Sequence, residues 1–167
     1  MKKIGLIFAE KAEKTSRMAK KIREAYGMKD IDLIPIEKAW ENDFEAYDNL
    51  IVGASTWFDG ELPVYWDELI PEVESLNLKG KKIAIFGLGD QVNYPENFVD
   101  GMGILANAFE KAGAKLVGFT PSEGYKFEQS QALRKGKWCG LVLDLENQPE
   151  LTDKRIEDWC KQIKSEF

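Results

Sequence analysis

The sequence predicts an α/β fold in which helices cover both faces of a parallel sheet. Short runs rich in Ile, Leu, Val, Phe and Ala recur along the chain, and segments with helical periodicity separate them. The apolar runs are continuous, which is typical of strands that are buried on both faces. This alternation favours a doubly wound sheet with right-handed crossovers. Ligands of such folds bind beyond the carboxyl ends of the strands, so we expect the site in the loops that follow them.

The expected strands are the apolar runs 4–8, 31–36, 50–54, 83–86, 116–119 and 140–143. The expected helical faces are Met18, Ile22 and Tyr26; Trp66, Leu69, Ile70 and Val73; Phe98, Met102, Leu105 and Phe109; and Ile156, Trp159, Ile163 and Phe167. Gly27 and Gly113 follow two of these helices where a C-cap glycine is favoured, and we expect Thr152 to cap the start of the last. The stretch 120–138 is long for a connection, which predicts a functional loop or an insertion within a strand.

Composition limits the function. The chain has 167 residues, 44% of them hydrophobic, which is enough apolar material for one domain spanning 1–167. Its 23 Lys and Arg against 29 Asp and Glu give a net charge of −6, so we expect no nucleic-acid partner. Histidine is absent, which excludes catalysis and metal binding that depend on imidazole. We therefore predict no catalytic and no metal-binding residues.

The cysteines and the N-terminus indicate the compartment. Cys139 and Cys160 lie in segments with buried character, and we expect reduced thiols packed in the core. No apolar run approaches the ~18 residues of a membrane span, and the first strand begins without a signal-type segment. These features predict a cytoplasmic protein that does not enter a membrane.

The loop after the first expected strand can receive an anion. Residues 9–16 open a helix, and the free N–H groups and dipole of a helix N-terminus favour negative charge. The segment 10–17 contains two carboxylates and three cations, which gives it a net charge of 3 − 2 = +1. Stabilisation of the helix dipole by Glu10 and Glu13 is the alternative to an anion site, and the residues alone leave both open.

Aromatic residues follow the third and fourth expected strands. Trp57 and Phe58 lie in the loop 54–62, and a glycine-rich turn with Tyr94 lies in the loop 87–97. Aromatic side chains on neighbouring strand ends can sandwich a flat ring, although each one alone is equally well explained as a half-exposed anchor. The residues therefore predict a flat-ring ligand without a strong phosphate grip, and the ligand would carry the chemistry.

Several motifs in this order resemble the long-chain flavodoxins over the whole chain. They are Thr56-Trp57, Gly60-Glu61-Leu62, Gly87-Leu88-Gly89-Asp90-Gln91 with Tyr94, Asn97-Phe98, Gly101-Met102-Gly103-Ile104-Leu105, Gly124-Tyr125, Gly140-Leu141, Asp144, Asn147-Gln148-Pro149 and Leu151-Thr152. The resemblance implies a flavodoxin-like, doubly wound, five-stranded parallel sheet with 120–138 as the insertion in its last strand. It also implies non-covalent binding of flavin mononucleotide (FMN) and low-potential one-electron transfer between redox proteins, not an enzyme.

The family pattern also assigns site residues. It places Trp57 and Tyr94 on either side of the isoalloxazine ring, the backbone near Asp90 and Asn97 at the pyrimidine edge, and Thr56 and Glu146 near the phosphate or ribityl region. The full set of cofactor-binding residues that we predict is Glu10, Lys11, Ala12, Glu13, Lys14, Thr15, Ser55, Thr56, Trp57, Phe58, Gly60, Leu88, Gly89, Asp90, Tyr94, Asn97 and Glu146.

Two departures from the family pattern modify the prediction. Flavodoxins hold the phosphate with Ser/Thr-x-Thr-Gly-x-Thr, and the aligned residues 10–15 keep only Thr15. Losing two hydroxyl donors removes roughly 3–6 kcal/mol of phosphate binding, of which Lys11 and Lys14 recover a part as point charges. We therefore expect weakened FMN binding, a preference for riboflavin, or an empty site. Phe58 stands where long-chain members commonly carry Asn, and a bulky residue resists the turn that stabilises the half-reduced flavin.

An acidic cluster predicts the partners. The cluster follows Trp57 and comprises Asp59, Glu61, Asp67, Glu68 and Glu72. Such a patch favours basic redox proteins, for example a flavodoxin reductase and an electron acceptor. An acidic surface that needs no partner is the alternative.

We expect a monomer. A flavodoxin-like binding or regulatory module with little or no flavin is the second function considered, and a flavin-dependent reductase is the third.

Overall fold

The computed structural model describes residues 3–56, 60 and 62–167. Its centre is a parallel sheet with the strand order β2-β1-β3-β4-β5, and β9 also pairs with β4. The strands are β1 (Ile4–Phe8), β2 (Ile31–Pro35), β3 (Asn49–Ser55), β4 (Lys82–Leu88), β5 (Lys115–Val117) and β9 (Leu141–Leu143). The first half of β4 pairs with β5 and its second half with β9. The predicted five-stranded sheet with an insertion in its last strand is therefore confirmed.

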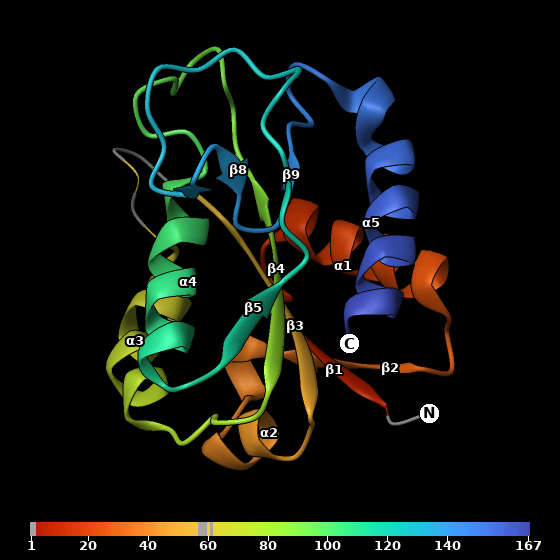
Figure 1. Cartoon of the computed structure of the whole chain (residues 1–167), viewed down its shortest axis with the longest axis vertical. Helices are drawn as coiled ribbons and strands as arrows, with labels where there is room; N and C mark the ends of the chain where they lie inside the picture. Colours follow the sequence, from red (N-terminus) through yellow and green to blue (C-terminus); the bar gives the residue numbers. More distant parts are fainter. Residues whose placement is uncertain (1–2, 57–59, 61) are drawn as a thin grey trace.

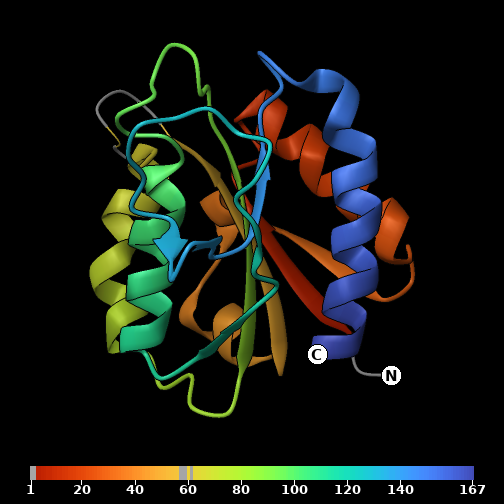
Figure 2. The same ribbon diagram turned by 45° about the horizontal axis from the view of Figure 1, so that its top comes forward.

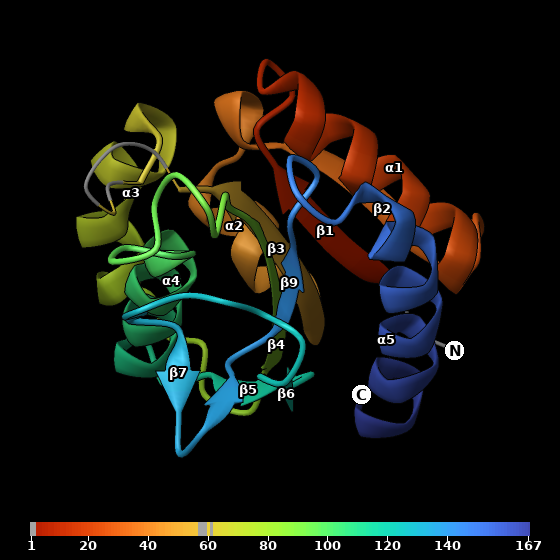
Figure 3. The same ribbon diagram turned by 90° about the horizontal axis from the view of Figure 1, so that it is seen from above.

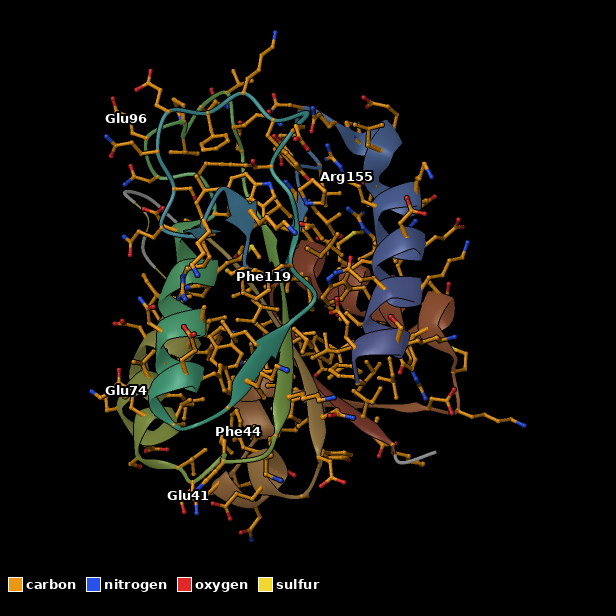
Figure 4. All side chains as sticks on the ribbon, viewed as in Figure 1. Glu41, Phe44, Glu74, Glu96, Phe119 and Arg155 are labelled. Carbon is orange, nitrogen blue, oxygen red and sulfur yellow. The ribbon has the colours of Figure 1, made fainter. Side chains whose placement is uncertain are left out.

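Helices cover both faces of this sheet. The longer ones are α1 (Glu13–Tyr26), α3 (Val64–Ser75), α4 (Asp100–Lys111) and α5 (Thr152–Glu166), and shorter ones are α2 (Glu41–Glu45), η1 (Ile36–Lys38) and η3 (Pro149–Leu151). α1 and α5 lie on one face, and α3 and α4 lie on the other (Figures 1 and 3). Each face has its own apolar core, in which Trp159 packs on one side and Trp66 on the other. Figure 4 labels Phe44 near the end of the molecule where α2 lies, and its ring packs against Phe109.

The insertion has a small sheet of its own. The strands β6 (Thr120–Pro121), β7 (Leu133–Arg134) and β8 (Lys137–Trp138) pair antiparallel in the order β6-β8-β7. Lys135 and Gly136 join β7 to β8 with φ of 53° and 80°, as a two-residue hairpin turn with positive φ at both positions requires. The fully buried Trp138 packs against Phe98. The insertion thus lies on the α4 side of the sheet (Figure 2).

Several element boundaries differ from the sequence prediction. Strand β5 ends at Val117 because Gly118 has a φ of +81°, which breaks the extended backbone. Strand β2 ends at Pro35, where η1 takes over. Thr152 is not the cap of α5: it is the first helical residue after η3, and its buried hydroxyl has no hydrogen-bond partner. Helix α4 begins two residues after Phe98.

The two cysteines confirm the prediction of buried thiols. Both are free and buried, and burial raises the pKa of Cys139 to about 11 and that of Cys160 to about 12. Both thiols therefore stay protonated at neutral pH. None of the helices in the described part of the chain has the length and apolar character that a membrane span requires.

Candidate functional site

A pocket of about 450 Å³ lies at the carboxyl edge of the sheet, where the loops after β1, β3, β4 and β9 meet. Figure 3 looks down on this edge. Its lining residues are Ala12, Glu13, Lys14, Thr15, Ser55, Thr56, Leu88, Gly89, Asp90, Tyr94, Leu145 and Glu146. The volume falls within the roughly 300–1,000 Å³ of small-molecule sites. All of these residues except Leu145 belong to the set predicted from the sequence.

The other predicted residues lie elsewhere. The backbone N–H groups of Glu10 and Lys11 donate to the Glu37 carboxylate, and neither residue lines the pocket. Gly60 and Asn97 also lie outside the lining, next to the carboxylate of Asp100. Trp57 and Phe58 lie outside the described residues, as do Asp59 and Glu61 of the acidic cluster.

One end of the pocket is formed by the start of α1. Ala12 is the N-cap of this 14-residue helix, and no side chain caps it. The N-terminal N–H groups and the helix dipole therefore favour an anion at this end. Lys14 extends from the first turn and forms an ion pair with Glu146 from the loop after β9. The pocket thus contains one cation close to an uncapped helix N-terminus.

The other end of the pocket is largely apolar. Leu88 and Leu145 line it, and Tyr94 contributes a side chain that is 44% exposed. A Cβ atom at Gly89 would lie 2.8 Å from a methyl carbon of Val99, so glycine allows the backbone to pack this close to Val99. This wall suits a flat ring that stacks on the tyrosine.

A buried carboxylate holds the loops of the apolar end together. Asp144 is fully buried and accepts hydrogen bonds from the backbone N–H groups of Gln91, Glu146 and Asn147, at 3.0–3.1 Å. The side-chain amide of Gln91 also donates to it at 2.6 Å. Because Gln91 in turn accepts the N–H of Lys126 at 2.7 Å, the insertion is bonded to the same network.

Asp90 joins this network from the loop after β4. Its carboxylate accepts the N–H groups of Val92 and Asn93 and the side-chain amides of Asn93 and Asn147. Burial raises the pKa of Asp90, but these hydrogen bonds outweigh that effect and lower the pKa below its usual value. Asp90 therefore stays ionised and fixes the turn that contains Tyr94.

A second buried carboxylate supports the floor of the site. Asp100, at the start of α4, accepts the N–H of Gln131 at 2.7 Å, and a side chain at Gly60 would meet it at 2.6 Å. Beside it, the N–H of Gly101 donates to the hydroxyl of Thr56 at 3.0 Å. The predicted residues Gly60, Thr56 and Asn97 are thus packed around the N-terminus of α4.

Three residues of the site were not predicted from the sequence. Leu145 gave no signal, because one more leucine beside a strand looks like core. Asp144 appeared only as a motif position, although a lone Asp at the end of an apolar run is a sign of loop anchoring. Glu37 follows β2, and only the pairing of β1 with β2 brings it near the first loop.

The fold and the pocket define a doubly wound α/β protein with a site for a flat ligand that carries negative charge at one end. The family model "Flavodoxin" matches residues 6–159. A flavodoxin of Synechococcus elongatus is 44% identical, over 100% of this chain and 99% of the relative, and that of Haemophilus influenzae is 41% identical over 98% and 95%. The chain therefore belongs to the flavodoxin family.

A solved structure agrees with this assignment. The flavodoxin of Fusobacterium nucleatum bound to flavin mononucleotide superimposes with a TM-score of 0.94 at 35% identity, over 100% of this chain and 99% of that one. Flavodoxins are electron-transfer proteins and not enzymes, so the predicted family and the electron-carrier function are confirmed.

Proposed function

We propose that the chain carries electrons on FMN bound in the pocket at the carboxyl edge of the sheet. One observation carries the proposal: the pocket joins an uncapped helix N-terminus with Lys14 at one end to an apolar wall with Tyr94 at the other. FMN has a phosphate at one end and a flat ring at the other, so the residues present fit it. When bound, FMN supplies the one-electron chemistry, and the chain holds and shields it.

The phosphate grip would be weaker than the family pattern provides. Glu13 and Glu146 bring negative charge to the pocket, and the loop keeps only Thr15 of the hydroxyl side chains in the family pattern. The first turn of α1, Lys14 and Thr15 are left for the phosphate. We therefore propose that the ring contributes a larger share of the affinity than in relatives with a hydroxyl-rich loop.

A parallel titration tests both parts of the proposal. Apo-protein is titrated with FMN and with riboflavin, and quenching of flavin fluorescence is followed. We expect both ligands to bind, FMN more tightly by one to two orders of magnitude. A gap of many decades would show that the loop rebuilds a full phosphate site. Absence of binding to either ligand, together with a colourless purified protein, would favour the regulatory module.

We further propose that the acidic face of α3 meets basic redox proteins. Asp67, Glu68 and Glu72 are exposed on this helix, which follows the loop after β3. One-signed patches accelerate encounter more than they raise affinity. A monomeric state and a cytoplasmic location also stay predictions.

Electron transfer from the reduced holoprotein to a basic haem protein tests the docking face. We expect the rate to fall steeply between low and high salt, and Glu68→Gln to lower the low-salt rate. Glu157→Gln removes the same charge from α5 on the opposite face of the sheet and is the matched control. Equal rates for the two variants would contradict docking through α3.

A further inference from the structure

Glu37 is bonded to the loop that begins the phosphate end of the pocket. Its two carboxylate oxygens each accept one backbone N–H, Oε2 from Glu10 at 3.1 Å and Oε1 from Lys11 at 3.0 Å. Both distances are those of well-formed hydrogen bonds. The carboxylate therefore satisfies two backbone donors in a loop whose own side chains provide no cap for α1.

The parallel pairing of β1 and β2 explains this contact. The last residues of the two strands, Phe8 and Pro35, are in register. Glu10 and Glu37 each come two residues later, so the two segments leave the same edge of the sheet side by side. η1 begins at Ile36, which is buried in the core and fixes the backbone from which Glu37 extends.

The contact lies outside the pocket itself. The lining begins at Ala12, whereas the N–H groups held by Glu37 belong to the two residues before it. Within the loop, Ala12 donates to the carbonyl of Ala9 at 3.2 Å, which closes a tight turn. Glu37 thus holds residues that precede the lining, and Glu37 itself does not line the pocket.

The charge state of Glu37 strengthens its hydrogen bonds to the loop. Burial raises its pKa, but hydrogen bonds from the backbone of Lys11, Glu37 and Glu10 and the charge of Lys11 outweigh it, so the pKa lies below the usual value. The side chain is ionised at neutral pH, and hydrogen bonds to an ionised acceptor are stronger than neutral ones.

We propose that Glu37 is a positioning residue that sets the preference of this protein for a phosphorylated flavin over one without phosphate. It holds residues 10 and 11 so that the first turn of α1 and Lys14 face the pocket. The proposal rests on the proposed function, because it concerns the phosphate end of the same site.

Three variants test the proposal. Glu37→Ala removes both acceptors, Glu37→Gln keeps one neutral acceptor in the same shape, and Glu24→Gln removes one charge from the exposed side of α1 as the matched control. For each apo-protein the Kd of FMN and the Kd of riboflavin are measured at constant pH and salt. Circular dichroism establishes that each variant is folded.

The readout is the ratio of the riboflavin Kd to the FMN Kd. We expect Glu37→Ala to lower this ratio about tenfold, as losing about one charge-assisted hydrogen bond would do. Glu37→Gln should lower it by less, and Glu24→Gln should leave it unchanged. A loss of stability alone would weaken both ligands together and leave the ratio as it was.

The remaining outcomes overturn one proposal or the other. An unchanged ratio in both Glu37 variants would refute the positioning role, and a raised ratio would show that Glu37 competes with the phosphate. If the wild-type protein itself does not distinguish the two ligands, the phosphate site of the proposed function fails. The wild-type titration thus separates the two failures.

Discussion

The two ends of the pocket are held in place in different ways. At the ring end, comprising residues 88–97 and 144–148, the loops are tied to the fully buried carboxylate of Asp144. At the phosphate end, comprising residues 9–15, the loop is held by the partly exposed Glu37 and by the ion pair between Lys14 and Glu146. The loops of the ring end are therefore anchored to a carboxylate in the core, and the loop of the phosphate end is held by partly exposed side chains.

Because of this difference, changes at one end should affect the stability of the fold, and changes at the other end should affect which ligand binds. Buried donors that lose their acceptor remain unsatisfied, so changes at the ring end affect the whole fold. Exposed ion pairs contribute little to folding, because water and salt screen them. Changes at the phosphate end should therefore alter which flavin binds while leaving the fold intact.

The largest effect is expected at Asp144. Asp144→Ala leaves the N–H groups of Gln91, Glu146 and Asn147 without their acceptor, and we expect the free energy of unfolding of the apo-protein to fall by about 3 kcal/mol or more. Urea unfolding measures it. FMN and riboflavin should lose affinity together, because the loops around the ring loosen.

Asp158→Ala is the control for this variant. Asp158 is exposed and pairs with Lys154 within α5, so its loss should change stability by less than about 0.5 kcal/mol. Asp144→Ala and the control could lower the free energy of unfolding equally. The loops of the ring end would then not be anchored in the core, and the proposed difference between the two ends would be wrong.

The next effect is expected at Lys14. Its side chain is 58% exposed and that of Glu146 is 48% exposed, so Lys14→Gln should change the free energy of unfolding by less than about 0.5 kcal/mol. The FMN Kd should nevertheless rise about tenfold and the riboflavin Kd stay constant, because Lys14 is the cation nearest the α1 N-terminus in the lining.

Lys20→Gln removes the same charge from an exposed position two turns along α1 and should affect neither Kd. Equal weakening of both flavins in Lys14→Gln would mean that Lys14 supports the pocket as a whole. The predicted division of roles between the two ends would then be wrong.

The strands of the core could be predicted from the sequence better than the short helices and helix starts between them. Continuous apolar runs located every strand of the main sheet, because burial on both faces leaves that pattern. α2 was missed because five residues with the single buried Phe44 show no periodicity. Thr152 was misplaced as a cap because nothing in the pattern shows that η3 runs directly into α5.

The supporting carboxylates of the site could not be predicted as such. Glu37 accepts backbone N–H groups 26 and 27 positions away in sequence, and Asp144 accepts one 53 positions away in addition to two local ones. A distant backbone donor has no sequence signature. Only the register of β1 with β2 and of β4 with β9 brings these groups together. The residues that line the pocket, except Leu145, were instead in the set that the resemblance to the family assigned.

The smallest effect is expected in how the stability of the apo-protein changes with pH. Here Asp90 represents the ring end and Glu37 the phosphate end. Hydrogen bonds lower both pKa values in the folded protein. A carboxyl with a lowered folded pKa stabilises the fold above its unfolded pKa of about 4, and this contribution is lost as the pH falls through the folded pKa. The urea midpoint of the apo-protein should therefore fall between about pH 5 and about pH 3.

Asp90→Asn and Glu37→Gln should each make that fall smaller, because the group that takes up the proton is gone. We expect the larger flattening for Asp90, whose carboxylate accepts side-chain amides from Asn93 and Asn147 in addition to two backbone N–H groups. A wild-type slope in either variant would show that its carboxyl has the same pKa folded and unfolded. A larger effect at Glu37 would mean that the phosphate end is coupled to folding as strongly as the ring end.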